Sequence, residues 1–394
     1  MKIAVLLGDE LQSGGSFKYQ MSVAKLLTLH QSHEYEFYFF ANKKTADLFK
    51  TILPVQVIEE NFIHKFHRFF LRNIIFLKTC QITKVEKLFD KYDIDLVYFL
   101  YPSGLSLDLV RHNYVITFWD IIHRDFPEFP EVNFYREFEI REEFYDRSLK
   151  KAVAVIAESE FGKQNILKKY NIDSYRITIC PFLLPPNIKK FLDYSDKGEI
   201  RIKNKYSLKN QYVFYPAQFW SGKNHIYILK ALKTLKDKYS LFIDAVFCGS
   251  DMGNLKHVLA KAKEFAISEQ VRYLGFVDDH DIPLLYKNAL ALVMPTYFGP
   301  TNIPPLEAFA LGCPVCYSDI DGLRGQIKDA GFLIDLKDPD TLAKIIIQII
   351  NNRELVNEKI NIGKKLINEW TEEEFWSNLK EIFDNFRIKR ECWK

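Results

Sequence analysis

Glycine and proline are scarce in this sequence, with 16 and 15 residues among 394. Such low counts exclude collagen-like and low-complexity chains, and a hydrophobic content of 48% indicates an ordered protein. No apolar run approaches the ~18 residues that a membrane-spanning helix needs. We therefore expect function to reside in folded sites. At roughly 150 residues per domain, the length predicts two or three domains.

An excess of charge of either sign is also missing. The 54 basic and 51 acidic residues leave a net charge of +3, so no overall field marks a partner for nucleic acid. Cysteine is sparse too: 6 residues stand at irregular positions, mostly in apolar runs, which favours reduced core thiols. The N-terminus becomes acidic too soon for a signal peptide. We expect a cytoplasmic protein that binds no nucleic acid.

Short apolar runs alternate with longer segments of helical periodicity along the chain. The runs expected to form strands are residues 3–7, 35–40, 96–99, 114–118 and 153–156, and then 212–215, 241–247, 271–274, 290–294 and 315–317. This alternation is typical of parallel sheets with crossover helices. It predicts an α/β protein with two doubly wound domains.

A proline-rich stretch at residues 180–187, followed by a polar stretch at 193–205, predicts the connection between the domains. We expect an N-terminal domain over 1–185, a C-terminal domain over 200–370, and over 371–394 a C-terminal helix that packs back on the N-terminal domain. Two such domains place the carboxyl ends of both sheets around one cleft. Helix N-termini there offer N–H groups to anions, so the cleft suits phosphorylated ligands.

Gly14 and Gly15 follow the first expected strand. They either let the backbone approach a ligand closely or simply form a tight turn. The surrounding residues do not form the Gly-x-Gly-x-x-Gly dinucleotide fingerprint, and the chain has no P-loop motif. Hydride transfer and P-loop chemistry therefore lose support.

The most informative segment is residues 295–315. An apolar strand leads into a loop rich in glycine and proline, Pro304 and Pro305 favour a helix start, and Glu307 follows in what we expect to be the first helical turn. This arrangement can hold a diphosphate and a ribose together. A simpler interpretation makes Glu307 only a favourable charge near a helix N-terminus.

This segment resembles the nucleotide-sugar domain of retaining glycosyltransferases of family four, and more narrowly a bacterial branch that builds O-antigen or capsule polysaccharide. The resemblance covers most of the chain and is strongest over residues 212–338. It implies the GT-B fold, with two Rossmann-like domains, and metal-independent transfer of a hexosyl group from a nucleoside diphosphate sugar (UDP or GDP) to a glycan or lipid-linked glycan. It implies no cofactor.

Within the family's motif, Glu307 matches the carboxylate that binds the ribose hydroxyls. The family's first glutamate, eight residues earlier, is replaced by Gly299, to which we assign no carboxylate role. We expect the loop to meet the donor's phosphate or sugar instead, through Gly299, Pro300, Thr301, Asn302 and Ile303.

A second match surrounds Lys223. Family members usually place an arginine and a lysine at the positions of Gln218 and Lys223, both directed at the diphosphate. The resemblance therefore implies that Lys223 stabilises the leaving group; without it, a lysine after a glycine is a solvated turn residue. The segment 271–277, with Phe276, is similar to the part that cradles the nucleobase.

In the N-terminal domain, Trp119 stands where family members often have a histidine beside the donor sugar, and Asp120 is retained. Asp120 is our candidate for orienting acceptor or sugar hydroxyls in catalysis, with His123 or Arg124 close to the phosphates. The alternative is a helix-capping aspartate and a surface histidine. Ser159 fits a helix N-cap at a turn near the cleft.

Several motifs of cysteine and aspartate resemble reactive or metal-binding sites, but their surroundings favour a structural role. Cys313 and Cys316 have redox spacing but enter an apolar strand, which favours buried thiols. The pairs Asp93/Asp95 and Asp319/Asp321 mimic a metal-binding motif, yet no convincing metal site emerges, and we expect no catalytic metal. Two other functions remain open: a non-catalytic nucleotide-sugar-binding subunit that partners an active transferase, and a nucleotide-sugar epimerase.

One stretch, residues 64–78, interleaves basic and aromatic side chains at helical spacing. This pattern suits a helix that lies on an anionic membrane surface, at the inner face of the cytoplasmic membrane, and equally a helix packed in the domain core.

Overall fold

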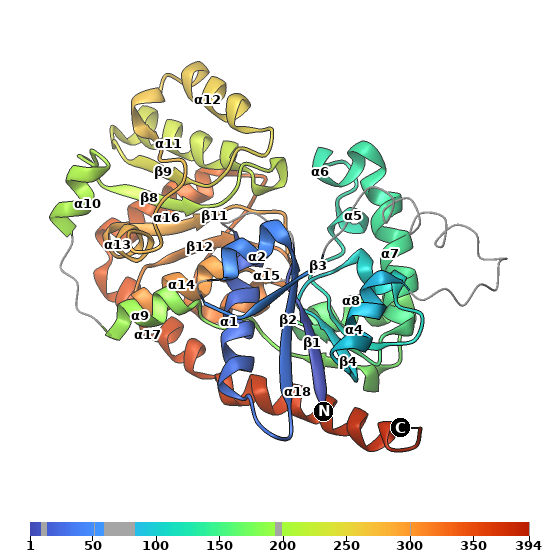
Figure 1. Ribbon diagram of the computed structural model, residues 1–394. Coiled ribbons are helices and arrows are strands. Elements are labelled where there is room, and N and C mark those ends of the chain that lie inside the picture. Colours follow the sequence, from blue (N-terminus) through green and yellow to red (C-terminus); the bar gives the residue numbers. More distant parts are fainter. Residues whose placement is uncertain (9–13, 51, 59–82, 194–198, 300, 394) are drawn as a thin grey trace.

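The computed structural model describes the chain except for residues 9–13, 51, 59–82, 194–198, 300 and 394 (Figure 1). Pro300 and the basic-aromatic stretch 64–78 therefore lie outside the described residues. The described part forms two parallel β-sheets, each covered by helices, which stand side by side in Figure 1. No helix among the described residues is long and apolar enough to cross a bilayer.

The first sheet has seven strands in the order β3-β2-β1-β4-β5-β6-β7, and every pairing is parallel. Its strands are β1 (Lys2–Leu6), β2 (Glu36–Asn42), β3 (Val55–Ile58), β4 (Leu96–Phe99), β5 (Asn113–Thr117), β6 (Ala154–Ala157) and β7 (Ile177–Ile179). Its helices are α1 (Gly15–Leu29), α2 (Lys43–Phe49), α4 (Lys84–Lys91), α5 (Ile122–Asp125), α6 (Pro130–Asn133), α7 (Glu137–Lys151) and α8 (Glu160–Tyr170).

The second sheet has six parallel strands in the order β10-β9-β8-β11-β12-β13. They are β8 (Tyr212–Pro216), β9 (Asp244–Cys248), β10 (Val271–Tyr273), β11 (Ala291–Met294), β12 (Val315–Ser318) and β13 (Phe332–Ile334). Around them lie α11 (His225–Tyr239), α12 (Leu255–Glu264), α13 (Ile282–Asn288), α14 (Ile303–Leu311), α15 (Leu323–Ile327), α16 (Pro339–Asn351) and α17 (Arg353–Asn368).

The apolar runs form strands because both faces of each sheet are covered. All four residues of β4, β6 and β11 are buried, which explains why the runs are continuous rather than alternating. The α/β prediction is confirmed. Three short strands, β3, β7 and β13, were not expected, since three or four residues with charged neighbours give no clear periodic signal.

The segment expected to connect the domains is largely helical. It contains α9 (Pro186–Asp193) and α10 (Glu199–Lys205), and the side chains of Ile188 and Ile202 are fully buried in the core of the second domain. Asp281 of that domain accepts hydrogen bonds from Arg201, Lys205 and Tyr206, which attach α10 to the second domain. The sequence shows no strong periodicity over residues 193–205, whereas residues 199–205 form helix α10; the placement of the domain connection at 180–205 stays a prediction.

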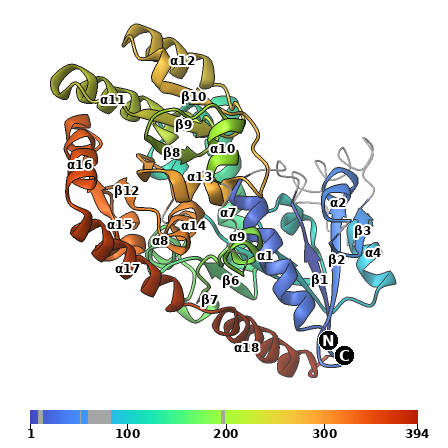
Figure 2. The ribbon, with the colours of Figure 1, turned by 90° about the vertical axis from the view of Figure 1, so that its left-hand side faces the viewer.

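After α17 the chain returns to the first domain as helix α18 (Glu372–Arg390), which lies under the first sheet beside the N-terminus (Figure 2). Thr371 and Glu374 form a reciprocal capping box that fixes the start of α18. Phe383 is fully buried against the rings of Tyr35, Phe37 and Tyr98. The last helix therefore completes the hydrophobic core of the first domain.

Replacing Phe383 tests this role of α18. Phe383→Ala should lower the free energy of unfolding by about 3–5 kcal/mol, because it removes a fully buried ring and leaves a cavity. Ile388→Ala, on the same helix at a site that is 64% exposed, should change it by less than about 0.5 kcal/mol. Urea unfolding of the full chain measures both, and equal losses would contradict the packing.

Candidate functional site

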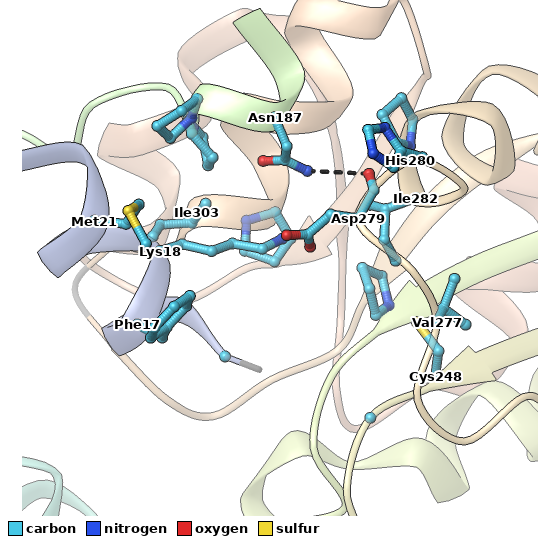
Figure 3. A pocket seen from close by; sticks show the side chains of 18 of the residues that line it. Phe17, Lys18, Met21, Asn187, Cys248, Val277, Asp279, His280, Ile282 and Ile303 are labelled. Carbon is cyan, nitrogen blue, oxygen red and sulfur yellow. Dashed lines mark hydrogen bonds between the residues drawn. The ribbon is translucent and has the colours of Figure 1, made fainter. Parts of the chain in front are cut away.

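A cavity of about 490 Å³ lies between the two domains. One wall is the start of α1 in the first domain, and the other is formed by loops at the carboxyl ends of β8, β9 and β10 and by the start of α14. In Figure 3, Phe17, Lys18 and Met21 approach from α1, while Cys248, Val277 and Ile282 approach from the second domain. Carboxyl ends of parallel strands are where open α/β sheets bind ligands.

Five of the residues singled out from the sequence meet in this cavity: Gly14, Gly15, Gln218, Phe276 and Ile303. Gly14 has φ of +151°, which a side chain would strain, and a Cβ there would lie 3.5 Å from Nε2 of Gln218. A glycine of the first domain thus faces the second domain across the cavity. Phe276 remains 66% exposed, so its ring is free to contact a ligand.

Glu307 is fully buried on α14, which begins two residues before Pro305. Because the helix begins at Ile303, Glu307 lies beyond its first turn, and the expected position in that turn was wrong. Tyr286 donates a hydrogen bond to Glu307 Oε2 at 2.8 Å, and Lys18 Nζ lies 2.5 Å from Oε1. Both carboxylate oxygens therefore have a partner, one from each domain.

Lys223 lies beside the cavity rather than among its lining residues. Its Nζ donates to Asn302 Oδ1 at 3.5 Å and lies 5.7 Å from the ring centre of Phe298. Burial lowers the pKa of Lys223 to about 8, although the carboxylates of Asp120 and Glu131 oppose that shift. The ammonium is therefore charged at neutral pH and close to losing its proton.

The loop before α14 explains the missing glutamate. Gly299 has φ of +88°, and a Cβ there would lie 2.9 Å from the carbonyl oxygen of Thr301. Any side chain at this position, a glutamate included, requires the loop to change shape. Asn302 is committed to the loop, with its Nδ2 donating to Phe298 O and Tyr317 Oη. The buried Thr301 Oγ1 has no hydrogen-bond partner among the described residues.

Asp120 follows β5 and faces the same region. Its Oδ1 accepts the N–H of Ile122 at 3.1 Å, and Arg141 Nη1 lies 3.6 Å away. Asp120 precedes Ile121, the N-cap residue of α5, and this helix has no side-chain cap, so Asp120 is not the helix cap of the alternative interpretation. Its charge raises the pKa of Lys223 and of Glu158. The indole Nε1 of Trp119 is buried and has no hydrogen-bond partner in the part of the chain that the structure describes.

His123 and Arg124 both contact Glu142 on α7. His123 is fully buried, so it is not a surface histidine, and its Nε2 lies 2.6 Å from Glu142 Oε1. Arg124 pairs with the same carboxylate and covers the ring of Tyr170 at 4.8 Å. Neither residue lines the cavity, so in this arrangement their partners are protein groups. Their contact with phosphates stays a prediction.

A second cavity, of about 900 Å³, also lies between the domains and is lined by Glu158 and Thr301 from opposite sides. Glu158 is 2% exposed, and no described residue forms a hydrogen bond with its Oε2. Burial raises the pKa of Glu158 to about 8, and the nearby charge of Asp120 adds to the shift. Glu158 is therefore protonated at neutral pH. Its neighbour Ser159 caps α8 by accepting the Gly162 N–H at 3.0 Å, as predicted.

The prediction that Cys313 and Cys316 are buried thiols is confirmed, whereas the absence of a catalytic metal stays a prediction. Cys313 and Cys316 are buried free thiols, and burial raises the pKa of both. Asp319 and Asp321 both pair with Arg324. Among the described residues, no three His, Cys, Asp or Glu side chains lie close enough to hold a metal ion.

Sequence reasoning missed several groups that join the domains. Lys18 was not singled out, although it stands one turn into the helix that Gly14 and Gly15 begin. Glu131 accepts the N–H of Gly222 at 2.7 Å from the other domain. Four aromatic rings meet across the interface, those of Phe126, Phe129, Tyr297 and Phe298. In the sequence, the two aromatic residues close together at 126 and 129, and the two at 297 and 298, were the available signal for this contact.

The fold defined by these sheets is that of the GT-B glycosyltransferases. HepE of Anabaena, solved with UDP and glucose, superposes with a TM-score of 0.75 at 16% identity, covering 98% of this chain and 99% of that one. WaaG, a glycosyltransferase involved in lipopolysaccharide biosynthesis, superposes with a TM-score of 0.70 at 15% identity, covering 96% and 98%.

Residues 196–366 match the family model of glycosyl transferases group 1, so this region is a domain of that family. Among curated relatives, O-antigen chain mannosyltransferase B of Escherichia coli is 28% identical over 240 residues, or 60% of this chain. The match spans 61% of that relative's length. The family resemblance drawn from the motif around Glu307 is thus confirmed.

The protonation of Glu158 predicts a pH-dependent stability. The unfolded chain loses this proton near its ordinary pKa of 4.5 and the folded protein only near 8, so the folded state loses stability as pH rises between these values. Glu158→Gln should remove this loss. Melting temperatures between pH 5 and 8 measure it, with Glu160→Gln as the exposed neighbouring control. Parallel profiles for wild type and Glu158→Gln would show that Glu158 is ionised.

Proposed function

We propose that this protein is a retaining, metal-independent glycosyltransferase that moves a hexosyl group from a nucleoside diphosphate sugar to a hydroxyl of a growing surface glycan of O-antigen or capsule type. The observation that carries the proposal is the buried carboxylate of Glu307 beside a cavity walled by both domains, within a region of the group 1 family. The name of the Escherichia coli relative supports the glycan class.

In this proposal the nucleotide occupies the 490 Å³ cavity, with the base near Phe276 and the ribose hydroxyls on Glu307. The backbone at Gly14 and Gly15 faces the diphosphate, since a glycine with positive φ allows close approach. Gln218 contributes an amide where the family usually has a cation. The HepE structure with UDP supports UDP as one donor nucleotide, and GDP remains the other candidate.

The chemical step needs stabilised negative charge on the departing diphosphate. The bond from the sugar's anomeric carbon to the phosphate oxygen breaks, and the acceptor oxygen attacks from the same face. The acceptor's proton passes to a phosphate oxygen of the leaving group. Lys223 supplies positive charge as that oxygen becomes anionic. Asp120 and the neutral acid Glu158, on the first domain's side, orient acceptor hydroxyls. No strong protein base, metal or cofactor is required.

The acceptor's location is a further part of the proposal. If the glycan is lipid-linked, the basic and aromatic side chains of residues 64–78 would hold the cytoplasmic protein against the anionic inner face of the membrane. Sedimentation with anionic liposomes at low and high salt tests this contact, which salt should weaken by screening.

Turnover tests the activity itself. UDP- and GDP-sugars are screened for binding, and those that bind are incubated with lipid-linked glycan acceptors in the presence of EDTA. We expect glycoside formation with retained anomeric configuration and no loss in EDTA. Glu307→Gln should weaken nucleoside diphosphate binding at least about tenfold, because each hydrogen bond to a charged group is worth about 1.5–3 kcal/mol.

An exposed carboxylate, Glu381 on α18, provides the matched control as Glu381→Gln. Unchanged affinity in a folded Glu307→Gln variant would remove the ribose assignment. Donor binding with no turnover on any acceptor would favour the alternative, a non-catalytic nucleotide-sugar-binding subunit, which the replaced family positions Trp119 and Gly299 make worth testing.

Lys223→Met should lower kcat far more than donor affinity, because charge on the diphosphate grows only as the glycosidic bond breaks. In the wild type, kcat/KM should fall as pH rises above about 8, where the Lys223 ammonium loses its proton, and Lys223→Arg should move this fall upward. Lys230→Met, an exposed lysine on α11, is the control. A change confined to KM would make Lys223 an ordinary binding residue.

A further inference from the structure

The ion pair between Lys18 and Glu307 joins the two domains at the cavity. Lys18 stands on α1 and Glu307 on α14, 289 residues apart in the chain. The carboxylate is fully buried, whereas the Lys18 side chain is 22% exposed and lines the cavity. A ribose hydroxyl can reach Glu307 only if a covering group moves, and Lys18 is the covering group that stands at the cavity's edge.

The other partner of Glu307 is poorly placed to move. Tyr286 is fully buried on α13, where its ring packs edge-on against Phe214 at 4.9 Å in the core of the second domain. Lys18 belongs to the opposite domain and carries its charge on a flexible stem of four carbons. Of the two partners of Glu307, Lys18 is therefore the one that can leave the carboxylate.

We propose that Lys18 is a donor-binding residue that exchanges partners: it pairs with Glu307 while the cavity is empty, and with the diphosphate once the ribose hydroxyls take Glu307. This inference rests on the proposed function, because it assumes that a nucleoside diphosphate enters the cavity. It adds a residue that the family's motif does not contain, on the domain opposite to Lys223.

The surroundings of Lys18 favour an anion as its second partner. The cavity's charged lining consists of Lys18, Lys25, Lys190 and Asp279, with His280 beside them, so positive charge predominates. The backbone N–H of Lys18 donates to Gly14 O at 3.1 Å, which places Lys18 one turn from the glycine that faces Gln218. A diphosphate that binds in the cavity beside Gly14 and Gln218 is thus within reach of the ammonium group.

The energetics couple the two events. A buried carboxylate left without a partner is strongly destabilising, so Lys18 leaves Glu307 only when ribose hydroxyls replace it. An ammonium that leaves a carboxylate also needs a new anion, which the diphosphate supplies and a free nucleoside does not. Lys18 therefore lowers the affinity for nucleosides and raises the affinity for nucleoside diphosphates. It acts as a residue that makes binding specific for the phosphate groups.

Calorimetry with two matched pairs of ligands, uridine with UDP and guanosine with GDP, tests the exchange. Lys18→Met should bind the nucleoside of the preferred pair at least about threefold more tightly than the wild type does, because the Lys18 ammonium no longer competes for Glu307. It should bind the corresponding diphosphate at least about tenfold more weakly, because the phosphates lose their ion pair. Lys44→Met, an exposed lysine on α2 that does not line the cavity, should leave the ratio of the two affinities within about twofold.

The outcomes separate this inference from the proposed function. If the wild type binds neither pair, the proposed function fails, and the inference fails with it. If the wild type binds and Lys18→Met changes nucleoside and diphosphate affinity by the same factor, Lys18 is only a structural partner of Glu307 and the inference is overturned. If Lys18→Met does not fold, Lys18→Gln replaces it, because glutamine keeps a hydrogen-bond donor for Glu307. Lys18→Gln must still lose the tighter binding of the diphosphate relative to the nucleoside, whereas Lys18→Arg, which keeps the charge, should largely retain it.

Discussion

A buried carboxylate between two domains is the constraint around which this molecule is organised. Glu307 is fully removed from solvent, and an ionised group there must be paired and hydrogen-bonded to be tolerated. Tyr286 meets that need from within the second domain and Lys18 from the first. The relative position of the domains and the ionic state of the site are therefore set together, and a ligand that takes the carboxylate also acts on the contact between domains.

Other contacts hold the same interface without blocking the cavity. Rings from Phe129 and Phe298 meet edge to face, and Glu131 accepts a backbone N–H from Gly222. At the far end, α18 crosses from the second domain and fills the core of the first. The chain thus ties its domains together beside Lys223 and through α18, in addition to the pair of Lys18 and Glu307 at the cavity.

The site differs chemically from the family pattern that it resembles. Gly299 takes a backbone conformation that disfavours any side chain, and Gln218 stands in place of a cation. Two groups that border the cleft have shifted pKa values near 8: that of the Lys223 ammonium is lowered and that of Glu158 is raised. Burial is the cause in both cases, so exclusion of water, rather than the number of charges, sets the electrostatics of the cleft.

The sequence by itself determined the two α/β domains, since fully covered parallel strands require continuous apolar runs, and runs such as residues 96–99 and 291–294 show them plainly. It also identified Glu307 and the glycine loops as candidates, because those motifs are local, although it placed Glu307 one turn too early in its helix. Tertiary structure decided the rest. The contact between Lys18 and Glu307, the neutral state of Glu158 and the commitment of His123 to Glu142 each depend on residues distant in the chain or on burial. Local residue spacing predicts neither a distance in space nor a desolvation energy, because both arise only when separate elements pack together.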